Sequence, residues 1–340
     1  MIPVPDGWTL LGKLKIGDKL YDESGRIRYV TSVASSHQPT YKVTFDNKET
    51  IFAAKDLPWH VTTGNDRGKN KGKSHVLTSE QLYLDKPIPG RRRWRKSYAL
   101  LYANPILDAP IYCLPLDPYL LGYWLGDGTK CTGAIAVKKN DYPNLTYWAE
   151  KAGYETSFNG SYYSYIKGLV PHLQLLKTFE DKSVPLPYLR ASVPDRLALL
   201  QGLMDSDGTP AFESARNTFY NTRLNLLDVV EELVHSLGGK SSRRLISEKG
   251  HVRNSINGSK PVIQTKDCYA VSFITPFNPF RLERKKRLAK ISTGWQKLAM
   301  IRCVELCDQQ ELVNIIIDSP SHYFLCGRSM LPILDASLSP

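Results

Sequence analysis

The sequence lacks every feature that would tie it to a membrane or to secretion. It has no apolar run of the roughly 18 residues that a transmembrane helix needs, no signal peptide and no basic amphipathic anchor. We therefore expect a cytoplasmic protein that is not secreted and has no membrane partner.

Cysteine and histidine are sparse, and neither is arranged for metal binding. The six cysteines form no Cys-x-x-Cys pair and have no histidine partner at the spacing of a zinc site. The seven histidines show no His-x-x-His arrangement of the kind that would suggest a histidine–metal nuclease. Carboxylates are left as the candidate metal ligands.

Negative charge is in short supply. Forty-five Lys and Arg stand against thirty-three Asp and Glu, which gives a net charge of +12 over 340 residues. This balance suits a polyanionic partner better than an acidic or neutral metabolite. The length allows two or three domains, each with a sizeable core.

One motif occurs twice. Residues 120–129 read LLGYWLGDGT, and residues 200–209 read LQGLMDSDGT. Start signals precede both copies, because Asp117-Pro118 offers an N-cap followed by proline and Ser192 stands three residues before Asp195, as in a capping box. The pattern predicts two short helices that each end at a glycine in the left-handed conformation.

Asp127 and Asp207 fall in the last turns of these predicted helices. The C-terminal end of a helix carries partial negative charge, so a carboxylate there is disfavoured by roughly 0.3–1 kcal/mol unless a cation lies nearby. Small residues one turn apart, Gly122 with Gly126 and Gly202 with Ser206, allow the helices to pack closely and bring the two carboxylates together. Ordinary buried helices with Asp-Gly turns would explain one copy, but explain two matched copies poorly.

The two copies resemble the signature helices of a single-chain LAGLIDADG homing endonuclease. The second copy is the closer match, whereas the first has Leu125 at the earlier acidic position of the motif. The resemblance implies an α+β fold with pseudo-two-fold symmetry, made of two αββαββα-type repeats. It also implies a monomer with internal pseudo-dimer symmetry that cuts double-stranded DNA at a long specific target site and leaves short 3′ overhangs, in a prokaryote, a phage or another DNA-containing compartment.

The expected elements repeat in order after each signature helix. The first repeat has strands near 134–138 and 156–169 around a helix at 142–152, and the second has strands near 212–220, 240–246 and 268–274 with a helix at 224–237.

Phosphodiester hydrolysis needs an activated water and neutralisation of the charge that grows on the phosphate, and a divalent metal supplies both. Oxygen ligands suit Mg²⁺, with Mn²⁺ as a substitute. We expect Asp127 and Asp207 to bind metal, one for each DNA strand, helped by the backbone carbonyls of Gly126 and Ser206.

A basic residue near each phosphate would stabilise the developing charge or polarise the water network. By resemblance to intein endonucleases we assign Lys182, which precedes the Val-Pro segment ahead of the second signature helix. Lys285 has a similar position before the end of the second repeat. Its rivals are Arg284, Lys286 and Lys266, and the alternative is a solvated basic helix.

Clustered basic residues are the candidates for DNA contact. One set lies in the most basic stretch, for which the alternative is a solvated linker, and the other lies on expected sheet faces that would read bases in the major groove. The first comprises Lys69, Lys71, Lys73, Arg91, Arg92, Arg93, Trp94, Arg95 and Lys96, and the second Lys138, Lys139, Arg243 and Arg244.

Both ends of the chain resemble a Hint domain, the protein-splicing fold of inteins. Pro-Asp-Gly-Trp at 5–8 and Leu-Lys-Ile-Gly-Asp at 14–18 match its beginning, residues 319–332 match its last strands, and 41–45 with 50–54 predict a hairpin. We expect a mostly-β Hint-like domain split around the endonuclease. The expected boundaries are 1–64 and 293–340 for the Hint-like parts, 65–112 for a basic DNA-contacting insertion, and 113–292 for the endonuclease with repeats 113–190 and 191–292.

Splicing residues of the family are missing. The chain starts at Met1 without the first nucleophile, Leu57 replaces the histidine of the second block, and Leu334-Asp335 replaces the terminal His-Asn pair. We therefore expect a splicing-defective Hint domain. Two alternatives stay open, an active protein-splicing intein and a catalytically inactive DNA-binding protein or maturase on the same scaffold.

Overall fold

A computed structural model describes the chain except residues 69–71, 86–96, 131, 254–261, 292–297 and 339–340. Its contacts divide the chain into two units, which are Met1–Ala109 with Thr293–Pro340, and Pro110–Ser292. A basic insertion was expected at residues 65–112. Its described residues up to Ala109 belong to the first unit. Among the described helices, none is both long and apolar enough to cross a bilayer.

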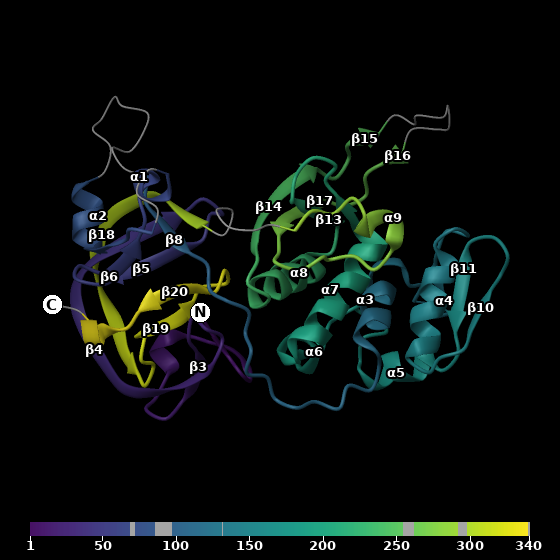
Figure 1. Ribbon diagram of the computed structural model, residues 1–340, viewed down its shortest axis with the longest axis horizontal. Helices are drawn as coiled ribbons and strands as arrows, with labels where there is room; N and C mark the ends of the chain where they lie inside the picture. Colours follow the sequence, from purple (N-terminus) through teal and green to yellow (C-terminus); the bar gives the residue numbers. More distant parts are fainter. Residues whose placement is uncertain (69–71, 86–96, 131, 254–261, 292–297, 339–340) are drawn as a thin grey trace. The chain divides into compact units, whose positions relative to one another are not determined.

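The first unit is mostly β and joins the two ends of the chain (Figure 1). Its two longest strands, β4 (Ile27–Phe45) and β18 (Leu298–Ile317), pair antiparallel from Val30 opposite Ile317 to Phe45 opposite Ile301. The predicted hairpin is confirmed, because β5 (Thr50–Ala54) pairs with β4. Two further strands extend this sheet, β3 (Lys19–Tyr21) and β8 (Ala99–Leu101).

Besides the 3₁₀ helices η1 (Leu11–Lys13) and η2 (Ala336–Leu338), three small hairpins and two short α-helices complete what is described of this unit. They are β1 (Ile2–Val4) with β2 (Gly7–Thr9), β6 (Pro58–Val61) with β7 (His75–Thr78), β19 (Tyr323–Cys326) with β20 (Leu331–Leu334), α1 (Gly64–Arg67) and α2 (Ser79–Leu84).

Two central helices organise the second unit (Figure 1). α3 (Pro118–Asp127) and α7 (Val193–Asp207) carry the repeated motif and start as predicted, since the side chains of Asp117 and Ser192 accept from the backbone N–H groups three residues on. Residues 118–125 of α3 are all buried. A helix that is apolar on every side belongs inside a core, and here that core surrounds the helix pair.

Each half of the unit builds a sheet with the same pairing order. In the second half, β12 (Gly208–Pro210), β13 (Asn217–Asn221), β17 (Cys268–Ile274) and β14 (Lys240–Ser247) lie in that order. In the first half, Gly128 bridges to β9 (Ile135–Ala136), followed by β11 (Tyr163–Ile166) and β10 (Thr156–Phe158).

The remaining elements follow the predicted order. The predicted helices are confirmed as α4 (Tyr142–Lys151) and α8 (Leu224–Ser236). The strand expected from residue 212 starts only at Asn217, because a turn precedes it in which the N–H of Ala211 donates to the carbonyl oxygen of Arg216. The others are α5 (Leu169–Leu175), α6 (Leu186–Arg190), β15 (Val252–Arg253), β16 (Val262–Ile263) and α9 (Glu283–Lys286).

The ends of the two central helices differ from the prediction. Gly128 and Gly208 are extended, with φ of −76° and −96°, and not left-handed. The chain runs straight from the last turn into a strand or bridge. Glycine is required there for another reason, because a Cβ would lie 2.2 Å from the Trp124 ring at position 128 and 2.5 Å from the Met204 side chain at position 208.

The two helices touch through backbone. A Cβ on Gly122 would lie 2.2 Å from the carbonyl oxygen of Leu199, and a Cβ on Gly202 would lie 2.1 Å from that of Tyr119. Both distances are far below van der Waals contact, so only glycine permits this approach.

We predict that Gly202→Ala lowers the free energy of unfolding of the second unit. Overpacking a tight core costs about 1–3 kcal/mol, which exceeds the gain in helix propensity of about 1 kcal/mol from replacing glycine. Denaturant titration measures the difference. Gly64→Ala is the matched control, because its Cβ would lie 3.9 Å from the nearest atom, and equal stability of the two variants would contradict the packing argument.

Candidate active site at the paired helix ends

The carboxylates of Asp127 and Asp207 lie where α3 and α7 end side by side. A Cβ built on Gly126 would be 1.9 Å from Ser206 Oγ and 3.3 Å from Asp207 Oδ2. Both aspartates are half-buried. The glycine contact thus brings two negative side chains together at two negative helix ends.

This environment opposes ionisation of both groups. Burial and then the charge of Asp207 raise the pKa of Asp127 to about 7. Burial also raises the pKa of Asp207. Two carboxyls that resist ionisation beside each other form a site that a cation would stabilise.

Lys182 supplies one positive charge to the pair. Its Nζ donates to the carbonyl oxygens of Trp124, Leu125 and Gly126 at 3.2, 2.9 and 3.2 Å, so it covers the open end of α3. The side chain is 2 % exposed. Burial lowers the pKa of this amine to about 8.

Lys285 does the same for α7. Its Nζ donates to the carbonyl oxygens of Met204, Asp205 and Gly208 at 3.0, 2.7 and 2.8 Å, and Ser206 O lies 3.5 Å away. It is 7 % exposed, and burial lowers its pKa to about 8. The alternative of a solvated basic helix is therefore wrong for this residue.

The rivals of Lys285 lie elsewhere. Arg284 forms a bidentate ion pair with Asp141 at 2.8 and 2.7 Å, while Lys286 and Lys266 are exposed. Only the tertiary structure separates Lys285 from these basic neighbours.

Each lysine covers one helix end but favours the carboxylate of the other helix. Burial and the charge of Asp207 raise the pKa of Asp127, and two lysine charges lower it. Of these two lysines, Lys285 has the larger effect. For Asp207, where burial is the largest effect, Lys182 contributes more. By their charge effects, Asp127 is coupled more strongly to Lys285, and Asp207 more strongly to Lys182.

Asn221 is a polar neighbour that the sequence did not reveal. Its Nδ2 donates to Asp207 Oδ2 at 2.9 Å from the end of β13. Strand β13 pairs with β12, which directly follows Asp207, and this pairing brings the amide back to the helix end. A polar residue at a strand end does not by itself indicate that its side chain contacts a carboxylate at a helix end.

The donor set fits a hard divalent cation. Two half-buried carboxylates and the carbonyls of Gly126 and Ser206 offer only oxygen, as Mg²⁺ prefers. Each carbonyl has two lone pairs, so a contact with lysine leaves one available. Within the described residues, no group of three or more His, Cys, Asp and Glu side chains could hold a metal, so water or substrate oxygens would complete the coordination.

The structure separates the expected DNA-binding residues. Arg243 lies within 2.5 Å of Asp228 and 2.6 Å of Glu231, both on α8, whereas Arg244 is exposed. Neighbouring strand residues face opposite sides of a sheet, so the two arginines cannot share an exposed face as expected. Arg243 therefore joins the sheet to α8.

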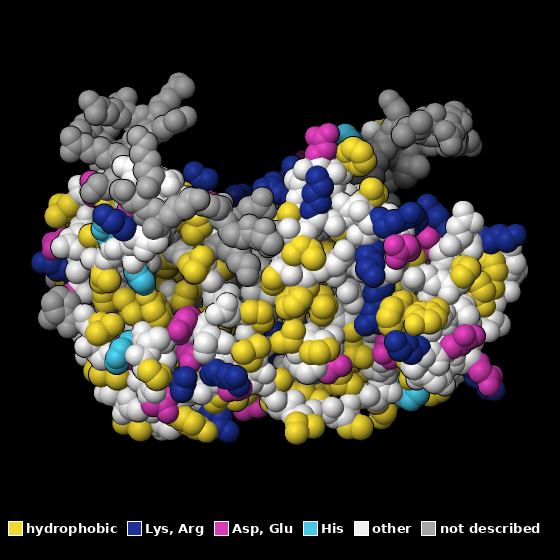
Figure 2. Space-filling view, viewed as in Figure 1, with side chains coloured by type: hydrophobic (Ala, Val, Ile, Leu, Met, Phe, Trp, Pro, Cys, Tyr) yellow, Lys and Arg dark blue, Asp and Glu magenta, His cyan; other side chains and the backbone are white. Residues whose placement is uncertain are grey.

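The other basic residues are either exposed or outside the described residues. Lys73, Lys138 and Lys139 are exposed. Figure 2 shows Lys and Arg side chains gathered over the part of the second unit where α3, α4 and α9 lie in Figure 1. The candidates outside the described residues are Lys69, Lys71, Arg91, Arg92, Arg93, Trp94, Arg95 and Lys96.

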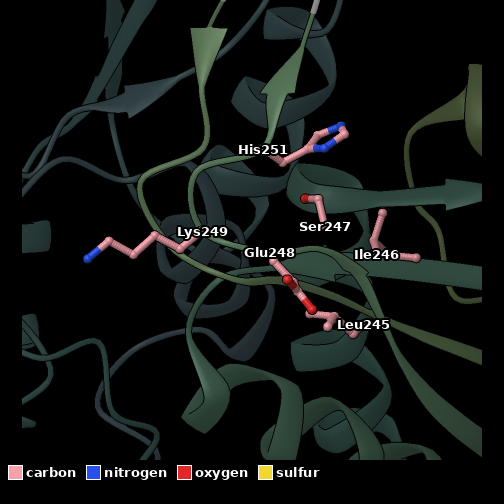
Figure 3. A pocket seen from close by; sticks show the side chains of 6 residues that line it. All are labelled: Leu245, Ile246, Ser247, Glu248, Lys249 and His251. Carbon is pink, nitrogen blue, oxygen red and sulfur yellow. The ribbon is translucent and has the colours of Figure 1, made fainter.

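A surface hollow of about 390 Å³ lies at the end of β14, away from the carboxylate pair. Glu248, Lys249 and His251 line it together with Leu245, Ile246 and Ser247, but the charged side chains point in different directions (Figure 3). Without converging polar groups, this hollow does not form a second catalytic site.

The positions expected to correspond to splicing residues lie in the first unit. Leu57 packs partly buried against its core, and Leu334 is buried at the end of β20. Asp335 is 1 % exposed, accepts from the backbone N–H of Ile317 at 3.1 Å, and lies 3.6 Å from His322. Alkyl groups thus occupy both positions at which the resemblance calls for an imidazole.

No protein-family model matches the chain. Replicative DNA helicase DnaB of Mycobacterium intracellulare is 27% identical over 356 residues, which cover 99% of this chain and 58% of the helicase, so the chain spans little more than half of that relative's length.

Among solved structures, the chain is similar to the MchDnaB-1 intein and to I-DmoI in complex with DNA and Ca. The intein gives 11% identity and a TM-score of 0.29, with 98% of this chain and 95% of that chain covered. I-DmoI gives 13% identity and a TM-score of 0.34, with 50% of this chain and 94% of that chain covered. Both TM-scores are below 0.5.

We predict that Asp127→Asn stabilises the metal-free protein above pH 7. Between the ordinary pKa of 3.8 and the raised pKa of about 7, the folded state holds a proton that the unfolded state has released. The free energy of unfolding of the wild type therefore falls as pH rises through this window. The variant avoids this loss and should gain about 1–3 kcal/mol at pH 8.

Denaturant titration in a chelator from pH 4 to pH 8 measures this gain. Asp228→Asn, which changes an exposed carboxylate on α8, is the control and should follow the wild type. Adding Mg²⁺ should stabilise the wild type and not Asp127→Asn. A variant that loses stability in parallel with the wild type would contradict the assigned environment of Asp127.

Proposed function

We propose that the chain is a site-specific, metal-dependent endonuclease of the LAGLIDADG homing type, built into a split Hint-like unit that does not splice. The observation that carries the proposal is the pair Asp127 and Asp207 at adjoining helix ends, each end covered by a buried lysine. The two similar halves of the second unit and the net charge of +12 support it.

Asp127 and Asp207 would hold Mg²⁺, or Mn²⁺ in its place, with Gly126 and Ser206 carbonyls as further ligands. When bound, the metal supplies charge neutralisation at the phosphate and an activated water. We assign one carboxylate to each DNA strand. Asn221 fixes one oxygen of Asp207 and leaves the other free to bind.

The lysines act here as fixed charges. An ammonium group has three N–H donors, and three carbonyl oxygens within 3.2 Å occupy those of Lys182 and likewise those of Lys285. A group whose protons are all engaged is poorly placed to transfer one. The arrangement favours electrostatic stabilisation of the charge that develops on the phosphate over general acid or base catalysis.

Double-stranded DNA with a long target is the proposed substrate, cut by a monomer to leave 3′ overhangs. Lys73, Lys138, Lys139 and Arg244 are exposed and available for phosphate or base contacts. Arg243 is not proposed as a contact, because two carboxylates already engage it.

The first unit is proposed as a scaffold or DNA-contacting module. Leu57 and Leu334 cannot perform the proton transfers of an imidazole. The burial of Leu334 at the end of β20, and of Asp335 against the backbone of Ile317 in β18, suits a structural role.

We predict that the wild type linearises a plasmid that carries its target in Mg²⁺. Asp127→Asn and Asp207→Asn should each slow linearisation by about 100-fold or more, because each removes a carboxylate ligand of the metal that neutralises charge at the phosphate. DNA binding, measured by electrophoretic mobility shift, should persist in both. Asp228→Asn should cut like the wild type.

Two results would contradict the assignment. Cleavage at the wild-type rate by both aspartate variants would exclude the metal ligands, and tight binding without cleavage in Mg²⁺ or Mn²⁺ would favour an inactive DNA-binding protein.

We also predict that the chain, expressed between two foreign flanking proteins, yields no ligated flanks. The physical reason is the alkyl side chain at positions 57 and 334. Mass spectrometry of the products checks this. A comparison variant, Asp335→Asn with Leu57→His and Leu334→His, returns the two imidazoles and the terminal amide but not the first nucleophile. Ligation by the unaltered chain would restore the intein alternative.

A further inference from the structure

The two motif copies differ two residues before each candidate metal ligand. Leu125 in α3 is apolar and fully buried, whereas Asp205 in α7 is a carboxylate that is 2 % exposed. A buried carboxylate is costly unless it is hydrogen-bonded.

Asp205 holds the segment that leads into α9. Its Oδ2 accepts from the backbone N–H groups of Arg281 and Leu282 at 3.0 and 2.9 Å, and from the Tyr119 hydroxyl at 3.0 Å. These are bonds between residues 76, 77 and 86 positions apart in sequence. One oxygen therefore fastens the start of α9 to the end of α7.

α9 needs such an anchor. It spans only Glu283–Lys286, and its N-cap residue Leu282 provides no side-chain cap. A single turn of helix is not stable by itself, because nucleation fixes several dihedral angles for very few hydrogen bonds. Lys285 lies in this turn, three residues after the anchored N–H of Leu282.

The side chain of Arg281 makes further contacts that hold the same segment. Its guanidinium lies 4.5 Å from the ring centre of Tyr119 and 4.1 Å from that of Trp148, and its Nε donates to Gln201 Oε1 at 2.8 Å. These contacts hold the side chain of residue 281, and Asp205 holds its backbone.

The first half places its lysine without a buried carboxylate. The backbone N–H of Lys182 donates to Thr178 O at 2.9 Å, and Asn225 Nδ2 donates to Lys182 O at 3.4 Å. Lys182 itself is left-handed, with φ of 57°. A local turn thus does for Lys182 what the long-range anchor does for Lys285, so leucine suffices at position 125.

We propose that Asp205 is a positioning residue that sets Lys285 against the end of α7 and thereby controls cutting of one DNA strand and not the other. The proposal rests on the endonuclease function proposed above. It predicts a strand bias, which general loss of stability would not produce.

The test uses the full-length chain and a duplex selected from a randomised library by cleavage with the wild type, labelled separately on each strand. Lys285→Met and Lys182→Met first identify the strand that depends on each lysine. Asp205→Leu, which copies the first half, should then slow the Lys285-dependent strand by about 10- to 100-fold. The other strand should keep the wild-type rate, so the product is a nicked duplex.

Conservative replacement separates positioning from charge. Asp205→Asn keeps an acceptor oxygen for both backbone N–H groups and should cut both strands. Combining Asp205→Leu with Lys285→Met should slow the affected strand no further than Lys285→Met alone, because both changes remove the same interaction. Leu121→Ala, a buried change in α3, is the control for lost stability and should show no strand bias.

Assays run well below the melting temperature of each variant, and Asp205→Ala replaces Asp205→Leu if leucine prevents folding. Equal slowing of both strands, slowing of the Lys182-dependent strand, or wild-type rates on both would overturn the proposal and leave the endonuclease function standing. A wild type that cuts neither strand of any selected duplex would instead overturn the proposed function, and the inference with it.

Discussion

The contact between α3 and α7 at Gly122 and Gly202 is the constraint on which the second unit depends. Each missing Cβ leaves room for a carbonyl of the other helix, at a distance where any side chain would clash. The core gathers around this pair, and the two similar sheets continue from its ends. Because the helices end together, whatever residues occupy their last turns are forced into one place, and here those residues are Asp127 and Asp207.

The electrostatic consequence is a site in which two carboxylates lie close together in an environment that disfavours their ionisation. Burial raises the pKa of both acids, and the charge of Asp207 raises that of Asp127 further. The open carbonyls of the two helix ends add partial negative charge beside them. Lys182 and Lys285 offset part of this cost, and every N–H of each ammonium is used in doing so. Charges held rigidly in this way need little reorganisation, which is the condition for strong electrostatic stabilisation of a developing negative charge.

The halves reach this common arrangement by different means. A local left-handed turn presents Lys182, whereas a buried carboxylate draws a distant segment against α7 to present Lys285. The departure of Leu125 from the acidic motif therefore need not weaken the first site, because that site has no distant segment to hold. In the first unit, pairing of β4 with β18 joins residues from the two ends of the chain, so an insertion between them leaves the sheet intact.

The sequence by itself determined those features that depend on neighbouring residues along the chain. Caps at Asp117 and Ser192, glycines one turn apart and alternating apolar residues predicted the central helices, their close contact and most strands, since each signal acts over a few residues. Other features required the tertiary structure, namely the extended glycines that end the helices, Arg243 turned toward α8, Asn221 beside Asp207 and the choice of Lys285 over its basic neighbours. These depend on which face of a strand is covered and which distant segment returns to a helix end, as between Asp205 and Leu282, 77 residues apart. No local pattern encodes such contacts, because packing across the whole unit decides them.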